Sequence, residues 1–265
     1  MKFAASFNVF DDTIELLPYS LKSIRKNVDY ISVVYQTVSN FGHRARPDFK
    51  KILYQLKDEG LIDKLYQYRP LPFFKPYMHE IRKRNIGLKL SQKTGAAYHL
   101  SMDSDEFYLP DAIERAKNIL TRGNYDSSFV YMQTLYKLPT QALTPPETYT
   151  VPLFYRIRKG FKYTWQTKNM PCVVDPTRGM KPGKFIIFKR EQIEMFHMSY
   201  VRRDIRKKLV NSSALENYSD RVEKIVDVYM KWEPGNKALL AGKEEVYSDT
   251  REVPNYFNIS VQDFQ

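Results

Sequence analysis

Apolar runs alternate with helix-forming segments over the first 110 residues, and this order constrains the fold more than any other feature of the chain. Four short runs have the length and the β-branched or aromatic content of buried strands: residues 2–10, 29–38, 63–70 and 96–102. Three segments between them carry helical periodicity and start or stop residues: 14–28, 49–60 and 79–95. This order predicts an α/β fold with a doubly wound, mostly parallel sheet flanked by helices.

The second half of the chain has a less regular pattern. It carries one helical segment, residues 111–120, and then three strand-like runs, residues 127–138, 151–165 and 184–190. Two more helical segments, 201–218 and 220–232, precede a weakly patterned tail. We therefore expect a first half over 1–110, a mixed second half of the same domain over 111–200, and a C-terminal helical region over 201–265.

Composition narrows the class of protein. No run of about 18 apolar residues is present, so the sequence predicts no membrane span. The N-terminus meets Asp11 and Asp12 too early for a signal peptide. The single cysteine, Cys172, excludes an intramolecular disulfide and a cysteine-based zinc site. These features predict a cytoplasmic protein.

Positive charge is concentrated in one segment. The net charge is +12, and residues 151–210 contain 15 Lys and Arg against four acidic residues, a difference of +11. Such a segment predicts an anionic partner such as phosphate, nucleic acid or a membrane surface. The alternative is a solvated basic face that serves solubility alone.

Three acidic residues follow the fourth strand-like run, at Asp103, Asp105 and Glu106. Ligand sites in doubly wound sheets lie beyond the carboxyl ends of the strands, which is where these residues fall. Two carboxylates one residue apart can bind a hard cation such as Mg²⁺ together with substrate phosphates. The alternative is a turn or helix cap, for which Asp is also favoured.

Several segments resemble the GT-A glycosyltransferases, in particular the large family-2-like group. The resemblance is carried by SFNVFDDTIELLPYSLKSI, YISVVYQTVSNFG, HEIRKRNIGLKLSQKTGAAYHLSMDSDEFY and FHMSYVRRDIRKKL. It implies a GT-A fold and a metal-dependent transferase that moves a sugar from a nucleotide-sugar, with uridine diphosphate as the expected carrier. Residues 1–110 would then bind the donor, and 111–200 would form the acceptor side.

The resemblance also implies roles for individual residues. Asp103, Asp105 and His197 would bind Mn²⁺ or Mg²⁺, although His197 also suits a hydrogen-bonded core residue. Contacts to the nucleotide-sugar are expected from Asn8, Gln36, Asn40, Arg84, Asn85, Asp103, Ser104 and Asp105. Many family members carry acidic residues after the second strand, whereas this chain has Gln36 and Asn40 there. For Arg84 and Asn85 the alternative is an exposed helix face.

The catalytic and acceptor residues are less constrained. Asp105 would act through the metal, and Asp175 is the candidate general base, with a turn before Pro176 as its alternative. The phosphate or acceptor contacts expected on the basic side are Arg202, Arg203, Lys207 and Trp165. An anionic acceptor such as hydroxymethylated phage-type DNA fits this charge, with Tyr163 and Trp165 stacking on an extruded base. A cell-surface glycan or a lipid-linked acceptor is the alternative, and a non-catalytic basic nucleic-acid-binding protein is a third hypothesis.

Overall fold

The structure is a computed structural model that describes residues 1–166, 170–171 and 175–264. Cys172 lies outside these ranges. The four strands predicted in the first half form the parallel part of the sheet, in the order β3–β2–β1–β4. Their bounds are β1 (Phe3–Val9), β2 (Tyr30–Tyr35), β3 (Lys64–Gln67) and β4 (Tyr98–Asp103).

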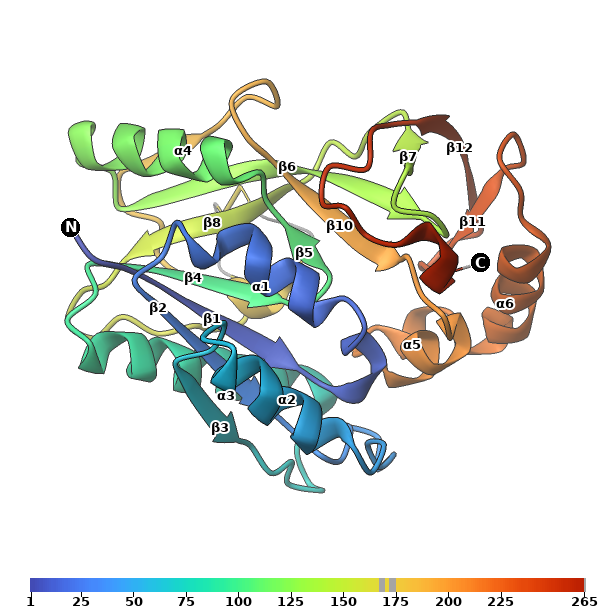
Figure 1. Cartoon of the computed structure of the whole chain (residues 1–265), viewed down its shortest axis with the longest axis horizontal. Helices are drawn as coiled ribbons and strands as arrows, with labels where there is room; N and C mark the ends of the chain where they lie inside the picture. Colours follow the sequence, from blue (N-terminus) through green and yellow to red (C-terminus); the bar gives the residue numbers. More distant parts are fainter. Residues whose placement is uncertain (167–169, 172–174, 265) are drawn as a thin grey trace.

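Helices cover both faces of this parallel region, as Figure 1 shows. They are α1 (Leu17–Arg25), α2 (Phe49–Asp58), α3 (Pro76–Lys93) and α4 (Pro110–Arg122). The apolar sides of α1, α2 and α4 share one core with alternate residues of β1, among them Phe3, Ala5 and Phe7. Helix α3 lies on the opposite face. The prediction of a doubly wound α/β fold is confirmed.

Helix α3 approaches the sheet over a row of small polar residues. Ser6, Ser32 and Ser101 lie side by side on β1, β2 and β4. A Cβ added to Gly87 of α3 would lie 1.9 Å from the Ser6 Oγ, so only glycine allows this approach. The α3 face of the sheet is therefore polar, and it leads to the carboxyl ends of β1 and β4.

The second half extends the sheet with antiparallel and parallel strands. Strand β8 pairs antiparallel with β4 and β6, whereas β9 and β10 run parallel to β6. The two-residue β5 pairs antiparallel with β10. The bounds are β5 (Glu106–Phe107), β6 (Ser127–Tyr136), β8 (Thr150–Arg156), β9 (Phe185–Ile187) and β10 (Glu194–Tyr200).

The C-terminal part contains the two expected helices and also two strands. Helices α5 (Ile205–Asn211) and α6 (Val222–Lys231) pack on each other through Ile205, Leu209 and Ile225. Strands β11 (Ala238–Leu240) and β12 (Val246–Glu252) then join the sheet through β7 (Gln141–Thr144). No helix in the described ranges is long and apolar enough to cross a membrane.

Candidate functional site

The carboxyl ends of β1 and β4 bring Asn8 and Asp103 together. These two residues are partners in the parallel register of the strands. Asn8 is 6 % exposed, and neither side-chain atom has a hydrogen-bond partner within the described part of the chain. A buried amide without a partner is costly, so this position is suited to a ligand or an ordered water.

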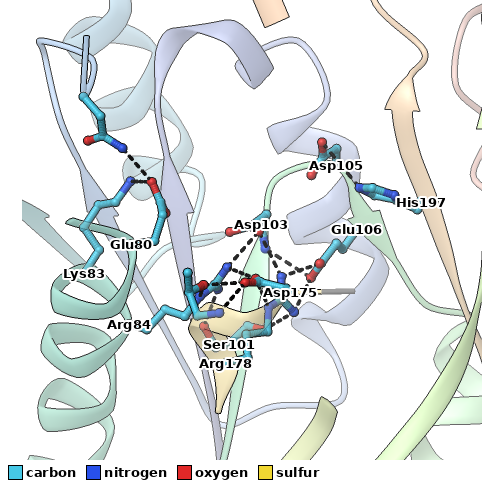
Figure 2. A network of polar contacts seen from close by, with 12 residues as sticks. Glu80, Lys83, Arg84, Ser101, Asp103, Asp105, Glu106, Asp175, Arg178 and His197 are labelled. Atoms are coloured by element: carbon cyan, nitrogen blue, oxygen red, sulfur yellow. Dashed lines mark hydrogen bonds and ion pairs between the residues drawn. The ribbon is translucent and has the colours of Figure 1, made fainter. Parts of the chain in front are cut away.

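Two arginines converge on the carboxylates at this edge. Arg84 of α3 donates to Asp103 at 3.0 Å and to Asp175 at 2.6 Å, and its other nitrogens donate to Ser101 and Thr177. Arg178 donates to Asp103 at 2.9 Å and to Asp175 at 2.8 Å. Figure 2 shows this network below the turn that follows β4.

Glu106 completes the network from the other side of the turn. Arg178 donates to both carboxylate oxygens of Glu106, and the backbone N–H of Asp103 donates to Glu106 as well. Both side chains of the Arg178–Glu106 pair are almost fully buried. Glu106 thus fixes the turn that carries Asp103 and Asp105.

The contacts of Asp175 make it a poor proton acceptor. Its carboxylate accepts from Arg84, Arg178 and the backbone N–H of Thr177, where it caps a short 3-10 helix (Pro176–Arg178). Burial opposes ionisation, but the two arginines outweigh it and hold the pKa of Asp175 well below its usual range. These contacts support the turn alternative and do not support the role of general base.

Asp105 lies in a separate group of side chains. Its Oδ2 accepts from Arg202 at 2.6 Å and from Lys208 at 3.0 Å, and it lies 3.8 Å from the Nε2 of His197. In Figure 2 the side chains of Asp105 and His197 point toward one another, away from the arginine network. Burial opposes ionisation, but Lys208 and Arg202 together keep the pKa of Asp105 well below its usual range.

Strand β10 explains why His197 lies there. The backbone N–H of Met198 donates to the carbonyl of Asp105 at 2.8 Å, and His197 pairs with Glu106 in the antiparallel register of β5 and β10. Burial lowers the pKa of His197, so its imidazole is neutral near pH 7 and has a lone pair for a metal.

The donor set at Asp105 fits a divalent cation in part. One carboxylate and one neutral imidazole are suitable ligands for Mn²⁺, with the remaining positions filled by phosphates and water. The described residues contain no group of three His, Cys, Asp or Glu side chains placed to hold a metal. Asp103, expected as a ligand, lies among the arginines, and Lys208 shares the Asp105 oxygen that the cation would need.

The residues expected to contact the nucleotide form a chain beside this site. The Gln36 amide donates to Asn40 at 3.2 Å, and Asn40 donates to Glu80 at 2.9 Å. Glu80 also pairs with the buried Lys83 at 2.9 Å. Sequence reasoning missed Glu80 and Lys83, although Lys83 adjoins the predicted Arg84.

Asn85 has a structural partner instead. Its amide donates to the carbonyls of Ile81 and Tyr163, and its oxygen accepts from the N–H of Tyr163, all at 2.9 Å. Asn85 therefore ties the segment after β8 to α3.

Trp165 is half exposed and packs edge-on against Tyr77 at the start of α3.

The remaining predicted residues lie around the turn after β1. Ser104 is buried and donates to Thr13, and Lys207 pairs with the buried Asp11, which Arg46 also contacts. Arg203 lies next to α5, where its backbone N–H donates to Glu15 at 3.2 Å. The structure thus places Ser104 and Lys207 close to the Asp105 group and fixes both through internal contacts.

Many of the basic side chains in residues 151–210 form ion pairs with acidic residues of the same chain. The cations with acidic partners in the described chain include Arg156, Arg158, Arg178, Arg190, Arg202, Arg206, Lys207 and Lys208. Most of their partners come from other segments: Asp11, Asp103, Asp105, Glu106, Asp126 and Glu223. The segment is therefore less available to an external anion than its net charge predicts.

Surface hollows do not coincide with these carboxylates. One hollow of about 480 Å³ lies between β3 and α3 and is lined by residues that include Tyr66, Arg82 and Lys89. Another, of about 280 Å³, includes Phe10 and Lys207 and so adjoins the turn after β1. Neither hollow is lined by Asp103, Asp105 or Asp175, which lie at the strand ends.

Solved structures resemble this fold although the sequences have diverged. The chain matches Staphylococcus aureus TarS residues 1–349 in complex with UDP with a TM-score of 0.50 and 13% identity, over 89% of this chain and 74% of that one. The same TarS fragment in complex with UDP-GlcNAc matches with a TM-score of 0.50 and 13% identity, over 84% and 70%. This chain has a GT-A-type fold.

The resemblance expected from the sequence is thereby confirmed at the level of the fold. This chain spans 44% of the longer TarS chain, which it matches with a TM-score of 0.48. No protein-family profile matches the chain, and no curated protein matches it in sequence.

Proposed function

We propose that the chain is a glycosyltransferase that binds a nucleotide-sugar at the carboxyl ends of β1, β2 and β4. The observation that carries the proposal is the proximity of the Asp105 carboxylate and the His197 imidazole, 3.8 Å apart, at this edge of a GT-A-type sheet. The TarS fragment with a similar fold was solved in complex with UDP-GlcNAc, and this favours a UDP-linked donor.

The nucleoside would lie against the chain of polar side chains from Gln36 to Glu80. Asn8 offers a donor and an acceptor that have no partners among the described residues, and Asp103 is held in place by Arg84 and Arg178. Because Asp103 is fixed by these arginines before the ligand arrives, it would lose little conformational entropy when it binds the ligand.

The diphosphate would face the Asp105 group. When bound by Asp105 and His197, Mn²⁺ or Mg²⁺ would neutralise the charge that develops on the leaving diphosphate. Arg202 and Lys208 supply fixed positive charge in the same place. During transfer the bond from the anomeric carbon to the diphosphate oxygen would break, and the nucleoside diphosphate would leave with the electron pair. The acceptor hydroxyl oxygen would form the new bond to the anomeric carbon, and its proton would pass to water.

The acceptor would approach from the half formed by residues 111–200. Fewer cations are available to DNA than the charge count indicated, because Arg178 and Arg202 are buried and paired. Transfer of labelled sugar to hydroxymethylated duplex DNA, compared with glycan and lipid-linked acceptors, tests this directly. DNA binding that ignores both a chelator and Asp105→Asn would instead favour the non-catalytic hypothesis.

Calorimetric titration of UDP in the presence of Mn²⁺ tests the donor site. We expect Asp105→Asn to weaken UDP binding by about tenfold or more, because the metal contact to the diphosphate is lost. Asp111→Asn, at an exposed position in the first turn of α4, should bind like the unmodified chain. Equal affinity of both variants would refute the proposed site.

A further inference from the structure

Lys208 occupies the position at Asp105 that a metal ion would need. Its Nζ lies 3.0 Å from the Asp105 Oδ2, the same oxygen that faces His197 Nε2 at 3.8 Å. Arg202 binds this oxygen as well, at 2.6 Å, so one carboxylate is contacted by two cations. A divalent ion that enters this group meets repulsion from both.

The two cations differ in how firmly they are held. The Arg202 side chain is fully buried and also donates to the carbonyls of Met198 and Val201, so it is fixed to the backbone. The Lys208 side chain is 21% exposed, and within the described part of the chain its ion pair is with Asp105. Lysine carries its charge on a flexible stem, so Lys208 is the cation that can leave.

Helix α5 leaves room for that movement without unfolding. The helix is anchored by Ile205 and Leu209 in the core shared with α6, and Asp204 caps its first turn. The neighbouring Lys207 is engaged separately, with Asp11. Rotation of the Lys208 side chain therefore requires the loss of one ion pair and no change in the backbone.

We propose that Lys208 gates the metal site: its ammonium holds Asp105 in the free protein and moves to the diphosphate of the donor when the donor binds. This inference rests on the proposed function, because it takes Asp105 and His197 as the groups that receive the metal. The phosphates attract Lys208 and at the same time complete the coordination of the cation. Metal binding is then coupled to nucleotide binding.

Titration of Mn²⁺ followed by the paramagnetic resonance signal of the free ion tests the gate, with and without UDP. We expect weak Mn²⁺ binding to the unmodified chain alone and tighter binding with UDP. Without UDP, Lys208→Met should bind Mn²⁺ roughly tenfold more tightly than the unmodified chain, since one screened repulsion is removed. UDP should then increase the Mn²⁺ affinity of this variant by a smaller factor. Lys208→Arg, which keeps the charge, should restore weak binding.

Matched variants separate the gate from general charge effects. Lys231→Met removes the same charge from an exposed ion pair on α6 and should leave Mn²⁺ binding unchanged, and Lys208→Gln serves if the methionine variant does not fold. The gate would be overturned if Lys208→Met and the unmodified chain bound Mn²⁺ equally well without UDP, or if Lys231→Met bound Mn²⁺ as tightly as Lys208→Met. Tightening in Lys208→Met without UDP binding to any variant would support the effect of Lys208 and refute the nucleotide site.

Discussion

Arg178 and Glu106 form a two-pronged ion pair between segments 72 residues apart, with both side chains buried. Arg178 also neutralises Asp103 and Asp175, so its loss leaves several buried carboxylates with fewer partners. We expect Arg178→Met to lower the free energy of unfolding by about 3–5 kcal/mol. Denaturant unfolding measures this, with Arg158→Met, at an exposed ion pair, as a control that should cost about 0–1 kcal/mol. Equal costs for the two variants would contradict the role of the buried network.

Stability should depend on pH through His99. This side chain is fully buried beside Ser91, and burial, with a smaller contribution from Arg84, lowers its pKa to about 3. The unfolded chain binds a proton at His99 below about pH 6.5 and the folded chain does not, so stability falls as the pH falls from 6.5 toward 3.

Comparison with His99→Gln isolates this effect. The pKa of Glu106 is raised by burial to about 7, which acts in the opposite direction, but it acts equally in both proteins. Between pH 7.5 and pH 5 the unmodified chain should lose about 2 kcal/mol relative to His99→Gln. Parallel stability curves for the two proteins over this range would show that His99 does not titrate as expected.

The close approach of α3 to β1 should make Gly87 intolerant of a side chain. A Cβ there would lie 1.9 Å from the Oγ and 2.5 Å from the Cβ of Ser6. We expect Gly87→Ala to cost about 1–3 kcal/mol, because the helix must move away from the sheet. In the double variant with Ser6→Gly the cost should be smaller than the sum of the single costs; additive costs would argue against this contact.

Asn85 should control the order of the segment around Tyr163. Asn85→Ala removes both hydrogen bonds to the Tyr163 backbone, and we expect a loss of about 1–3 kcal/mol in stability. Hydrogen exchange at the Tyr163 amide should accelerate, whereas Lys89→Ala, exposed one turn further along α3, should leave it unchanged. An unchanged exchange rate in Asn85→Ala combined with weaker UDP binding would restore the nucleotide role first expected for this residue.

The first half of the fold was predictable because its local signals agree with its packing. Strands β1, β2 and β4 are short, mostly apolar runs that are almost entirely buried, and helix signals separate them. Strand β12, by contrast, is mostly exposed and rich in charge, so its sequence carries no strand pattern, and pairing with β7 defines it. The expected strand over 151–165 ends at Arg156, because the following residues turn back toward α3 and Asn85.

The site was predictable in its position and less so in its contacts. The carboxyl end of β4 located Asp103 and Asp105, since strand order alone places that edge. Arg178 and Lys208 contact these acids from segments distant in sequence, and Asp175 contacts the same Arg178, which no local pattern records. For the same reason the sequence did not show that many basic side chains of residues 151–210 are paired, because most of their acidic partners lie in other segments.

Turnover of a panel of nucleotide-sugars with Mn²⁺ tests the proposed enzyme most directly. UDP-sugars should be hydrolysed or transferred, a chelator should stop the reaction, and added Mn²⁺ should restore it. Asp105→Asn should lower kcat by about 100-fold or more, because charge on the leaving diphosphate is no longer neutralised, while Asp111→Asn should retain full activity. Full activity in Asp105→Asn, or the absence of turnover with every nucleotide-sugar, would contradict the assignment.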